Sequence, residues 1–301
     1  FKSQNMALNS YVTDDGMEIG RAQAMQAQAA GIKPTVDMNP ILLKPTSNTG
    51  SQVIVNGRVL SNMNALEYYR QKKDFVPVIL NSYRRLCRQY DVIVIEGAGS
   101  PAEINLNEND IVNMGLAKLL DAPVILIADI DRGGVFASIY GTVALLDDES
   151  RSRIKGIVIN KFRGDKNLLL PGFKMLQSHF KNIDINIPIL GAVPMVDIDI
   201  DDEDSLSEKL DTEDVNFSND KINIAVIKLP HISNFTDFNP LSRRKEIALK
   251  YISDTSEIIG ADLIIIPGTK NTIFDLRWLK RRGFTKYVLV DKNICGICGG
   301  F

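Results

Sequence analysis

The sequence is short of several residue types, and each shortage excludes a class of protein. Three cysteines occur among 301 residues, too few for a disulfide framework. Lysine and arginine number 35 against 37 acidic residues, and this formal charge of −2 argues against a surface that neutralises nucleic-acid phosphates. No apolar run approaches the roughly 20 residues that span a bilayer, and no signal-peptide pattern opens the chain. We therefore expect a cytoplasmic globular protein without nucleic-acid or membrane partners.

The chain is long enough for two domains, because a domain usually holds roughly 100 to 200 residues. Short β-branched runs alternate with longer amphipathic patterns, which is typical of a parallel sheet covered by helices. Residues 52–60, with Asn56-Gly57 between two apolar runs, predict a β-hairpin. The predicted central strands are residues 92–95, 124–128, 156–160 and 187–193. The predicted helices are residues 18–30, 76–89, 110–120, 135–146 and 168–180.

An acidic stretch separates this pattern from a second one. Residues 197–214 contain ten acidic residues and one lysine, which is typical of a solvated, self-repelling connector. The predicted fold is α/β, with a parallel-sheet domain over residues 1–196, an acidic linker over 197–220 and a second, partial α/β domain over 221–301. In this second domain we predict strands at 222–229, 263–266 and 287–290, and helices at 241–252 and 272–282.

Glu96 ends one predicted strand and is followed by a glycine-rich turn. Ligands of open α/β sheets bind outside the carboxyl ends of the strands, so Glu96 would project where the Mg²⁺ of a nucleotide lies. Gly97 and Gly99 permit close approach of the backbone to a ligand, which favours this interpretation. The alternative is that Glu96 caps a helix or pairs with a lysine.

Asn160, Lys161 and Arg163 follow another predicted strand of the same sheet. The Asn amide offers a donor and an acceptor, which suits the edge of a purine, and the basic side chains can cover the face of a base. The pattern therefore indicates a base-reading loop, although polar residues are also common in loops without any ligand.

Asp129, Asp131 and Arg132 end the strand between those two and precede Gly133-Gly134. Two acids, a guanidinium and flexible glycines at a strand's carboxyl end predict a loop for phosphate, metal or substrate. A salt-bridged turn explains the same residues equally well.

Cys298 lies in the string Gly296-Ile-Cys-Gly-Gly. A nucleophile on a sharp turn between strand and helix needs small neighbours, and a helix N-terminus behind it lowers the pKa of a thiol. The pattern predicts a nucleophile elbow. With Cys295 it also forms C-x-x-C, so a redox pair or half of a zinc site remain as alternatives.

Two parts that such sites need do not occur in the sequence. There is no G-x-x-x-x-G-K-[ST] string, so we expect a phosphate-binding loop to precede Phe1. His179 falls in a predicted helix and His231 begins a loop, and neither is favoured as the base for Cys298. We expect the catalytic histidine to follow Phe301, which predicts that these 301 residues are inactive by themselves.

Long strings over nearly the whole chain resemble the cobyric acid synthase family, the glutamine-dependent amidases of cobalamin biosynthesis. The strings of the first predicted domain are FKSQNMALNS (1–10), EIGRAQ (18–23), VDMNP (36–40), LKPT (43–46), GSQ (50–52), EGAGSPAEINL (96–106), ADIDRGGVFAS (128–138) and NKFRGD (160–165). Those of the second are ISNFTD (232–237), PGTKNT (267–272) and GICGG (296–300).

The resemblance implies a dethiobiotin synthetase-like ATP domain with a P-loop-type site, followed by a class I glutamine amidotransferase domain. It implies that ATP, with Mg²⁺, phosphorylates carboxylates of the corrinoid adenosylcobyrinic acid a,c-diamide, and that ammonia from glutamine converts carboxylates b, d, e and g to amides. It also implies a role for individual residues: Glu96 and Glu18 at the metal, Asn160, Lys161 and Arg163 at the adenine, Lys2 at the phosphate, Cys298 as nucleophile, the Gly268 and Gly299 amides in the oxyanion hole, and Ser3, Gln4, Asn5, Asp129, Asp131 and Arg132 on the substrate side.

Two other functions stay open at this point. A cobyrinic acid a,c-diamide synthase-like amidase would differ in the carboxylates that it accepts, and the long opening string argues against it. A ParA-like nucleotide-binding regulator would need no nucleophile, so an intact Cys298 elbow argues against that function.

Overall fold

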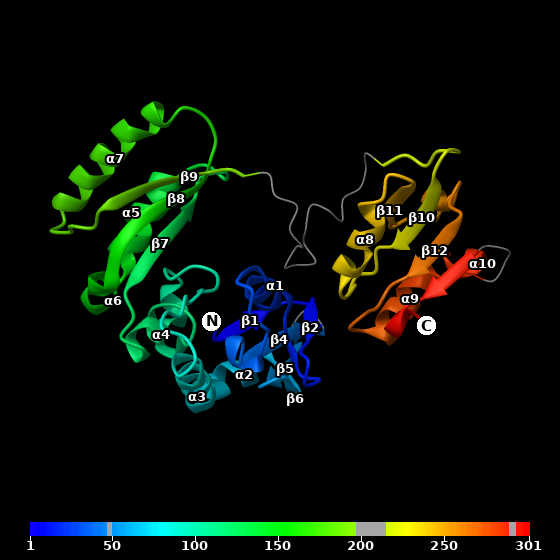
Figure 1. Cartoon of the computed structure of the whole chain (residues 1–301), viewed down its shortest axis with the longest axis horizontal. Coiled ribbons are helices and arrows are strands. Elements are labelled where there is room, and N and C mark those ends of the chain that lie inside the picture. The colour runs from blue at the N-terminus through cyan, green and yellow to red at the C-terminus, as the bar shows by residue number, and fades with distance from the viewer. Residues whose placement is uncertain (47–49, 197–214, 289–292) are drawn as a thin grey trace. The chain divides into compact units, whose positions relative to one another are not determined.

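The computed structural model describes residues 1–46, 50–196, 215–288 and 293–301. The chain divides into two compact units, of which the first contains Phe1–Ile95 and Ile200–Phe301 and the second contains Glu96–Asp199 (Figure 1). Residues 197–214 of the predicted acidic linker lie outside the described residues. The α/β class with parallel sheets is confirmed.

The amino-terminal part of the first unit is a mixed sheet in the order β1-β4-β5-β6. Strands β1 and β4 are parallel, whereas β5 and β6 form the predicted hairpin. Asn56 and Gly57 turn this hairpin with φ angles of 46° and 77°, the left-handed conformations that a two-residue turn requires. The elements are β1 (Gln4–Met6), β2 (Ser10–Val12), β3 (Glu18–Gly20), α1 (Arg21–Ala29), β4 (Ile41–Pro45), β5 (Gly50–Val55), β6 (Arg58–Asn64), α2 (Ala65–Gln71) and α3 (Val76–Cys87).

The carboxyl-terminal part of the first unit is a parallel sheet in the order β11-β10-β12-β13. Its central strand β10 is buried at Ala225, Val226 and Ile227, as expected of a parallel strand that is covered on both faces. The elements are β10 (Ile222–Ile227), α8 (Asn239–Ser242), β11 (Ile247–Ile252), β12 (Leu263–Ile266), α9 (Thr272–Arg281), α10 (Thr285–Val288) and β13 (Asn293–Gly296).

Two predictions for this sheet are wrong. Residues 241–252 do not form one helix, because β11 pairs along its whole length with β10 and this partner overrides the local helical pattern. Residues 287–290 do not form a strand over their described part, since Tyr287 and Val288 end the short helix α10. The strand that reaches Cys298 is β13, which pairs with β12.

The second unit packs helices against a parallel sheet in the order β7-β8-β9 (Figure 1). Ile139 and Val143 of α5 and Leu176 and Phe180 of α7 form its core together with Ile157 of β8. The elements are α4 (Met114–Leu119), β7 (Val124–Asp129), α5 (Val135–Leu145), α6 (Asp148–Arg153), β8 (Ile154–Phe162), α7 (Lys166–Lys181) and β9 (Ile189–Pro194). Three predicted strands and two predicted helices are thereby confirmed.

The predicted strand at residues 92–95 is wrong. Val92 and Val94 are 77% and 79% exposed, and within the described residues no strand pairs with this segment. An apolar run becomes a strand only where a neighbour completes the ladder of hydrogen bonds.

Two helices begin later than predicted, for local reasons. Residues 18–20 form β3 by pairing with β2, so α1 begins at Arg21. The carboxylate of Asp110 accepts hydrogen bonds from the N–H groups of Val112, Asn113 and Gly115, which holds a turn before α4. Among the described helices, none combines the length and apolarity needed to cross a bilayer.

Candidate active site

Cys298 lies on a strained turn directly after β13. The N–H of Ile297 donates to the carbonyl of Ile266 at 3.0 Å, which extends the pairing of β12 and β13 to the residue before the cysteine. Cys298 then adopts φ = 50°, in the left-handed region that residues with a Cβ atom avoid. Its side chain is exposed. An exposed thiol on a strained residue is the arrangement that a nucleophile elbow requires.

The glycines around Cys298 are required by close backbone approach. A Cβ atom on Gly300 would lie 2.2 Å from the carbonyl oxygen of Ile266, and one on Gly296 would lie 2.7 Å from that of Gly300. On Gly299 it would lie 3.1 Å from Cγ2 of Thr269. Real Cβ atoms do not come as close to backbone as at Gly296 and Gly300. Steric exclusion therefore explains why glycine occupies these two positions.

Gly268 lies beside Cys298, as the oxyanion-hole prediction needs. A Cβ atom built on Gly268 would be 3.6 Å from the Cβ atom of Cys298. The loop of Gly268 runs along the loop after β10, since the N–H of Ser233 donates to Gly268 O at 2.9 Å and the N–H of Lys270 to His231 O at 3.1 Å. That the Gly268 and Gly299 amides stabilise an oxyanion stays a prediction.

A buried aspartate behind these loops was missed in the sequence. Asp275, in the first turn of α9, is 1% exposed. Its carboxylate contacts Nδ1 of His231 at 2.9 Å and accepts hydrogen bonds from the backbone N–H of His231 at 3.2 Å and from the hydroxyl of Thr269. The string PGTKNT contains Thr269, but nothing in the sequence pairs it with an acid at the next helix start.

A group of charged residues in the first unit surrounds Glu18, one of the predicted metal ligands. Lys44 is 3% exposed and pairs with Glu18, and its ammonium also donates to the hydroxyl of Ser10 at 2.8 Å. Burial alone would raise the pKa of Glu18, but hydrogen bonds from Lys44 and Ser10 and the charge of Lys44 lower it. Glu18, predicted as a metal ligand, thus has a lysine partner.

Lys270 belongs to the same group. Burial and the nearby charge of Lys44 lower the pKa of Lys270 to about 8, while the charges of Glu18 and Cys298 act in the opposite direction. The pKa of Lys270 is therefore sensitive to the charges of both Glu18 and Cys298.

Hydrogen bonds also connect the opening string with the loops near Cys298 in the first unit. The N–H of Ser10 donates to Oδ1 of Asn234 at 3.0 Å, and the hydroxyl of Ser233 donates to the carbonyl of Leu8 at 3.3 Å. Asn271 caps α9 with its Oδ1 and donates from Nδ2 to the carbonyl of Thr46 at 3.1 Å. The same loops thus contact residues of both parts of this unit.

The residues predicted to contact phosphate and substrate near the amino terminus are largely enclosed. Lys2, Ser3 and Asn5 are 5%, 0% and 3% exposed. The amide of Asn5 donates to Gln23 at 3.1 Å, and Gln4 accepts a hydrogen bond from the hydroxyl of Tyr68 at 2.7 Å. Their roles toward a ligand stay predictions.

The strand-end loops of the second unit are open and carry exposed ion pairs. Lys161 pairs with Asp129 at 2.8 Å and Arg163 with Asp131 at 3.5 Å, so the basic side chains predicted for the adenine lie beside the acids predicted for the substrate. The hydrogen bond from Lys161, together with one from the backbone N–H of Asp131, lowers the pKa of Asp129. A salt-bridged turn is therefore present at this loop, and the roles of its residues toward a ligand stay predictions.

Asn160 and Arg132 belong to the same edge of the sheet. Asn160 ends the pairing of β8 with β7 opposite Asp129, and its carbonyl accepts from the N–H of Ile130 at 3.2 Å. Arg132 is exposed in the turn that follows and its charge also lowers the pKa of Asp129.

Glu96 is half-buried at the start of the second unit. The turn after it is held by Asn113, whose side chain accepts from the N–H of Ala98 at 3.0 Å and donates to its carbonyl at 2.7 Å. Among the described residues, no three His, Cys, Asp or Glu side chains gather as a metal site.

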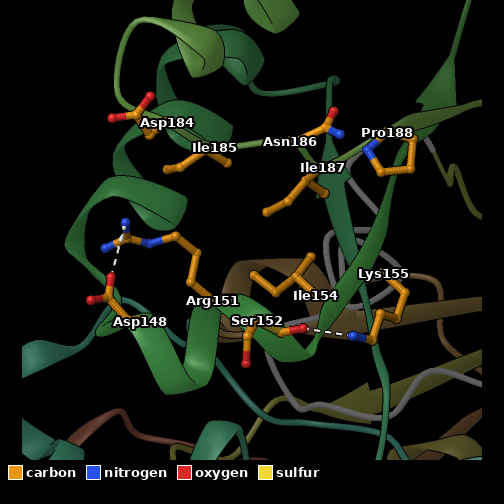
Figure 2. A pocket seen from close by; sticks show the side chains of 10 residues that line it. All are labelled: Asp148, Arg151, Ser152, Ile154, Lys155, Asp184, Ile185, Asn186, Ile187 and Pro188. Carbon is orange, nitrogen blue, oxygen red and sulfur yellow. Dashed lines mark hydrogen bonds and ion pairs between the residues drawn. The ribbon is translucent and has the colours of Figure 1, made fainter.

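A hollow in the second unit lies at the other edge of the sheet (Figure 2). It is lined by Ile154, which begins β8, and by Pro188, which precedes β9. Arg151 pairs with Asp148 at 3.4 Å, and Lys155 donates to the carbonyl of Ser152 at 2.7 Å. This position is the amino-terminal edge, away from all predicted ligand residues of this unit.

Two known domain families match the chain. Residues 22–201 match the AAA domain, and this range covers more than half of the chain. Residues 223–301 match the CobB/CobQ-like glutamine amidotransferase domain, and this range contains Gly268, Asp275 and Cys298. No solved structure matches the chain.

Curated relatives match along the whole chain. It is 57% identical to the cobyric acid synthase of Lachnoclostridium phytofermentans, 55% identical to that of Ruminiclostridium cellulolyticum and 52% identical to that of Yersinia enterocolitica. The chain belongs to the family of this AAA domain, and along its whole length it is similar to cobyric acid synthases. Each alignment covers 100% of this chain and 58% of the relative, so the chain spans little more than half the length of the relatives that it matches.

Proposed function

We propose that this chain is part of an enzyme that uses ATP and glutamine to convert the b, d, e and g carboxylates of adenosylcobyrinic acid a,c-diamide to amides, giving adenosylcobyric acid. The observation that carries the proposal is Cys298, which stands on a strained turn among sterically required glycines within the range that matches a glutamine amidotransferase domain. The corrinoid substrate is proposed by analogy with the cobyric acid synthases, and a cytoplasmic location is part of the same proposal.

In the glutamine half of the reaction, the thiolate of Cys298 attacks the carboxamide carbon of glutamine. The C–N bond breaks, the leaving nitrogen takes a proton, and ammonia departs from a thioester that water hydrolyses to glutamate. The negative oxygen that forms in between needs donors aimed at it, and the Gly268 and Gly299 amides are the groups that we assign to this task. The 3.6 Å approach of Gly268 to Cys298 supports the assignment.

In the ATP half, a carboxylate oxygen of the corrinoid attacks the γ-phosphoryl group of ATP and ADP leaves; ammonia then forms the amide C–N bond and displaces phosphate from the acyl phosphate. A carboxylate itself resists ammonia, whereas an acyl phosphate has a good leaving group. We assign Lys2 to the transferring phosphate, Asn160, Lys161 and Arg163 to the adenine, and Ser3, Gln4, Asn5, Asp129, Asp131 and Arg132 to the substrate side.

A half-buried carboxylate at Glu96 fits Mg²⁺, which proteins commonly hold through one or two carboxylates together with phosphate oxygens and water. The ion would neutralise phosphate charge. Glu18 fits less well, since Lys44 already neutralises it. We keep the domain limits of residues 1–196 and 221–301, with the connector at 197–220, as part of the proposal.

The test uses the full-length protein with Mg-ATP, glutamine and adenosylcobyrinic acid a,c-diamide, followed by mass spectrometry of the corrinoid. We expect stepwise conversion of four carboxylates to amides. Cys298→Ala should abolish glutamine use and leave ammonia as a working nitrogen donor. Hydrolysis of ATP without any change in the corrinoid would contradict the proposed acceptor, and glutamine use by Cys298→Ala would contradict the proposed nucleophile.

A further inference from the structure

Asp275 is a buried ionisable residue in the first turn of α9, and the glutamine reaction as proposed does not use it. The residue is 1% exposed and its carboxylate meets three polar groups: the hydroxyl of Thr269, the backbone N–H of His231 and the ring nitrogen Nδ1 of His231. A buried carboxylate needs such partners, because burial of an unpaired charge is strongly unfavourable. All three partners belong to the two loops that adjoin Cys298.

Thr269, the first partner of Asp275, packs against the turn of Cys298. The Oγ1 atom of Thr269 contacts Asp275 and accepts a hydrogen bond from the N–H of Asn271 at 3.0 Å. The other branch of this side chain, Cγ2, lies 3.1 Å from the position of a Cβ atom on Gly299, and the carbonyl of Thr269 lies 3.2 Å from the same point. Asp275 therefore fixes the rotamer of a side chain that packs against the backbone after the nucleophile.

The second partner fixes the neighbouring loop. His231 is held to Asp275 by both its ring and its N–H, and its carbonyl accepts from the N–H of Lys270. Two residues further on, the N–H of Ser233 donates to Gly268 O at 2.9 Å. Gly268 therefore precedes Thr269, which Asp275 binds directly, and is hydrogen-bonded to the loop of His231, which Asp275 binds as well.

We propose that Asp275 is a positioning residue for glutamine hydrolysis: through Thr269 and His231 it holds the Gly268 and Gly299 amides at the place where the oxyanion forms. This role rests on the proposed function, because it presupposes attack on glutamine by Cys298. Asp275 itself touches none of the reacting atoms.

The role predicts a particular kinetic pattern. Oxyanion-hole amides act on the tetrahedral intermediate more than on bound glutamine, so their displacement lowers kcat and leaves KM nearly unchanged. Ammonia-dependent amidation does not pass through an oxyanion at Cys298, and alkylation of the thiol by iodoacetamide needs none. A carboxylate that only stabilised the fold would affect all of these readouts together.

The experiment compares Asp275→Asn, Thr269→Val and Thr269→Ser in the full-length protein. Thr269→Val keeps the shape of the side chain and removes the hydroxyl, whereas Thr269→Ser keeps the hydroxyl. We expect Asp275→Asn and Thr269→Val to lower the glutamine-dependent kcat by about 10-fold or more with KM within about 2-fold. Thr269→Ser should retain most of the activity. Ammonia-dependent amidation and the iodoacetamide rate at Cys298 should match the wild type in all three.

Asp262→Asn is the control for loss of a carboxylate that accepts a backbone hydrogen bond, here from the N–H of Asn223 at 2.7 Å, at an exposed position outside both loops. Unchanged glutamine kinetics in Asp275→Asn, or an equal loss of ammonia-dependent activity, would overturn the positioning role. If Asp275→Asn does not fold, equal kinetics of Thr269→Val and Thr269→Ser would overturn it. Glutamine use that survives Cys298→Ala would instead refute the proposed function, and the positioning role with it.

Discussion

Two glycine-containing turns follow parallel strands of this protein, and they need glycine for different reasons. After β13, a Cβ atom on Gly296 or Gly300 would collide with backbone at 2.7 and 2.2 Å. After β7, nothing lies within 4 Å of such an atom on Gly133 or Gly134, whose φ angles are 76° and 68°. The first turn is limited by space and the second by backbone conformation alone, although Gly-Gly occurs in both strings.

An ion pair of the first unit and one of the second also differ in how far their side chains are buried. Lys44 and Glu18, whose neighbour Ser10 is hydrogen-bonded to Asn234 in the loop after β10, have side chains that are 4% and 24% exposed. Lys161 and Asp129, beside the turn after β7, are 44% and 37% exposed. Charge pairs matter more where water cannot replace the lost partner. The crowded turn should therefore be the less tolerant in every respect.

The largest expected difference is between Gly300→Ala and Gly133→Ala. The first substitution forces backbone apart and should lower the free energy of unfolding by about 3 kcal/mol or more, whereas the second adds only left-handed strain of about 1 kcal/mol. Denaturant unfolding measures both: fluorescence of the single tryptophan, Trp278, reports on the first unit, which contains Gly300, and far-UV circular dichroism also follows the second unit, which contains Gly133. Equal losses would remove the distinction between the turns.

Gly141→Ala is the control for these two substitutions. Gly141 lies within α5 with nothing inside 4 Å of an added Cβ atom, so alanine should stabilise the helix by about 0.5–1 kcal/mol. A loss of stability there would show that added volume is harmful in general.

The next largest difference is between Glu18→Gln and Lys161→Met. Glu18→Gln leaves the ammonium of Lys44 buried without its carboxylate and should lower the free energy of unfolding by about 2 kcal/mol. Lys161→Met should change the free energy of unfolding by no more than about 0.5 kcal/mol. The pKa of Glu18 is lowered in the folded protein, so its contribution is present above pH 4.5, the ordinary pKa, and is lost as the pH falls through the folded pKa. Unfolding curves of wild type and Glu18→Gln should converge in acid; a constant gap would contradict the ion pair.

A smaller effect is expected from the strain at Cys298. Glycine tolerates φ = 50° and alanine does not, so Cys298→Gly should be more stable than Cys298→Ala by about 1 kcal/mol. Both variants lack the thiol, and neither should use glutamine. Thermal unfolding of the pair measures the strain without any contribution from activity, and a more stable alanine variant would mean that the residue is not held in the left-handed region.

The smallest effect is a shift in the titration of Lys270. Its pKa in the folded protein is about 8, so stability should rise as the pH increases from about 8 toward 10.5, where the unfolded chain still holds the proton. Removing the attraction of Glu18 by Glu18→Gln should lower the pKa of Lys270 further. NMR of the ¹³C-methylated lysines measures this shift, and an unmoved titration would separate Lys270 from the Glu18 and Lys44 group.

The sequence predicted most of what depends on local pattern. The alternation of strands and helices, the hairpin at Asn56-Gly57 and the need for small residues around Cys298 all follow from residues adjacent in the chain. The helix predicted over residues 241–252 failed because β11 is stabilised by its pairing with β10, a contact that spans 20 or more residues and leaves no local signal. The segment at 92–95 failed for the opposite reason, since its apolar run has no pairing strand among the described residues.

The candidate site could be predicted from the sequence at the turn of Cys298 and much less so behind it. Cys298 stands in a string with few interpretations, whereas Asp275 is one acid at the start of a helix, a position that acids occupy for many reasons. Its partners Thr269 and His231 are brought to it by the parallel order of β10 and β12. The pairing of Glu18 with Lys44 likewise arises from the fold. It gives a lysine partner to a carboxylate that the sequence analysis assigned to a metal.

The extension of the β12 and β13 pairing to Ile297 has a consequence for chain length. Because Ile297 is hydrogen-bonded to Ile266 and Gly300 fits against the same carbonyl, an extra residue between Gly296 and Gly300 would move the thiol off the sheet edge. In the turn after β7, nothing lies within 4 Å of a Cβ atom built on either glycine, so close packing does not fix the length of that turn. A fluorescent tag or epitope inserted after Arg132 should therefore leave the protein folded, whereas the same insertion at Cys298 should disrupt the fold.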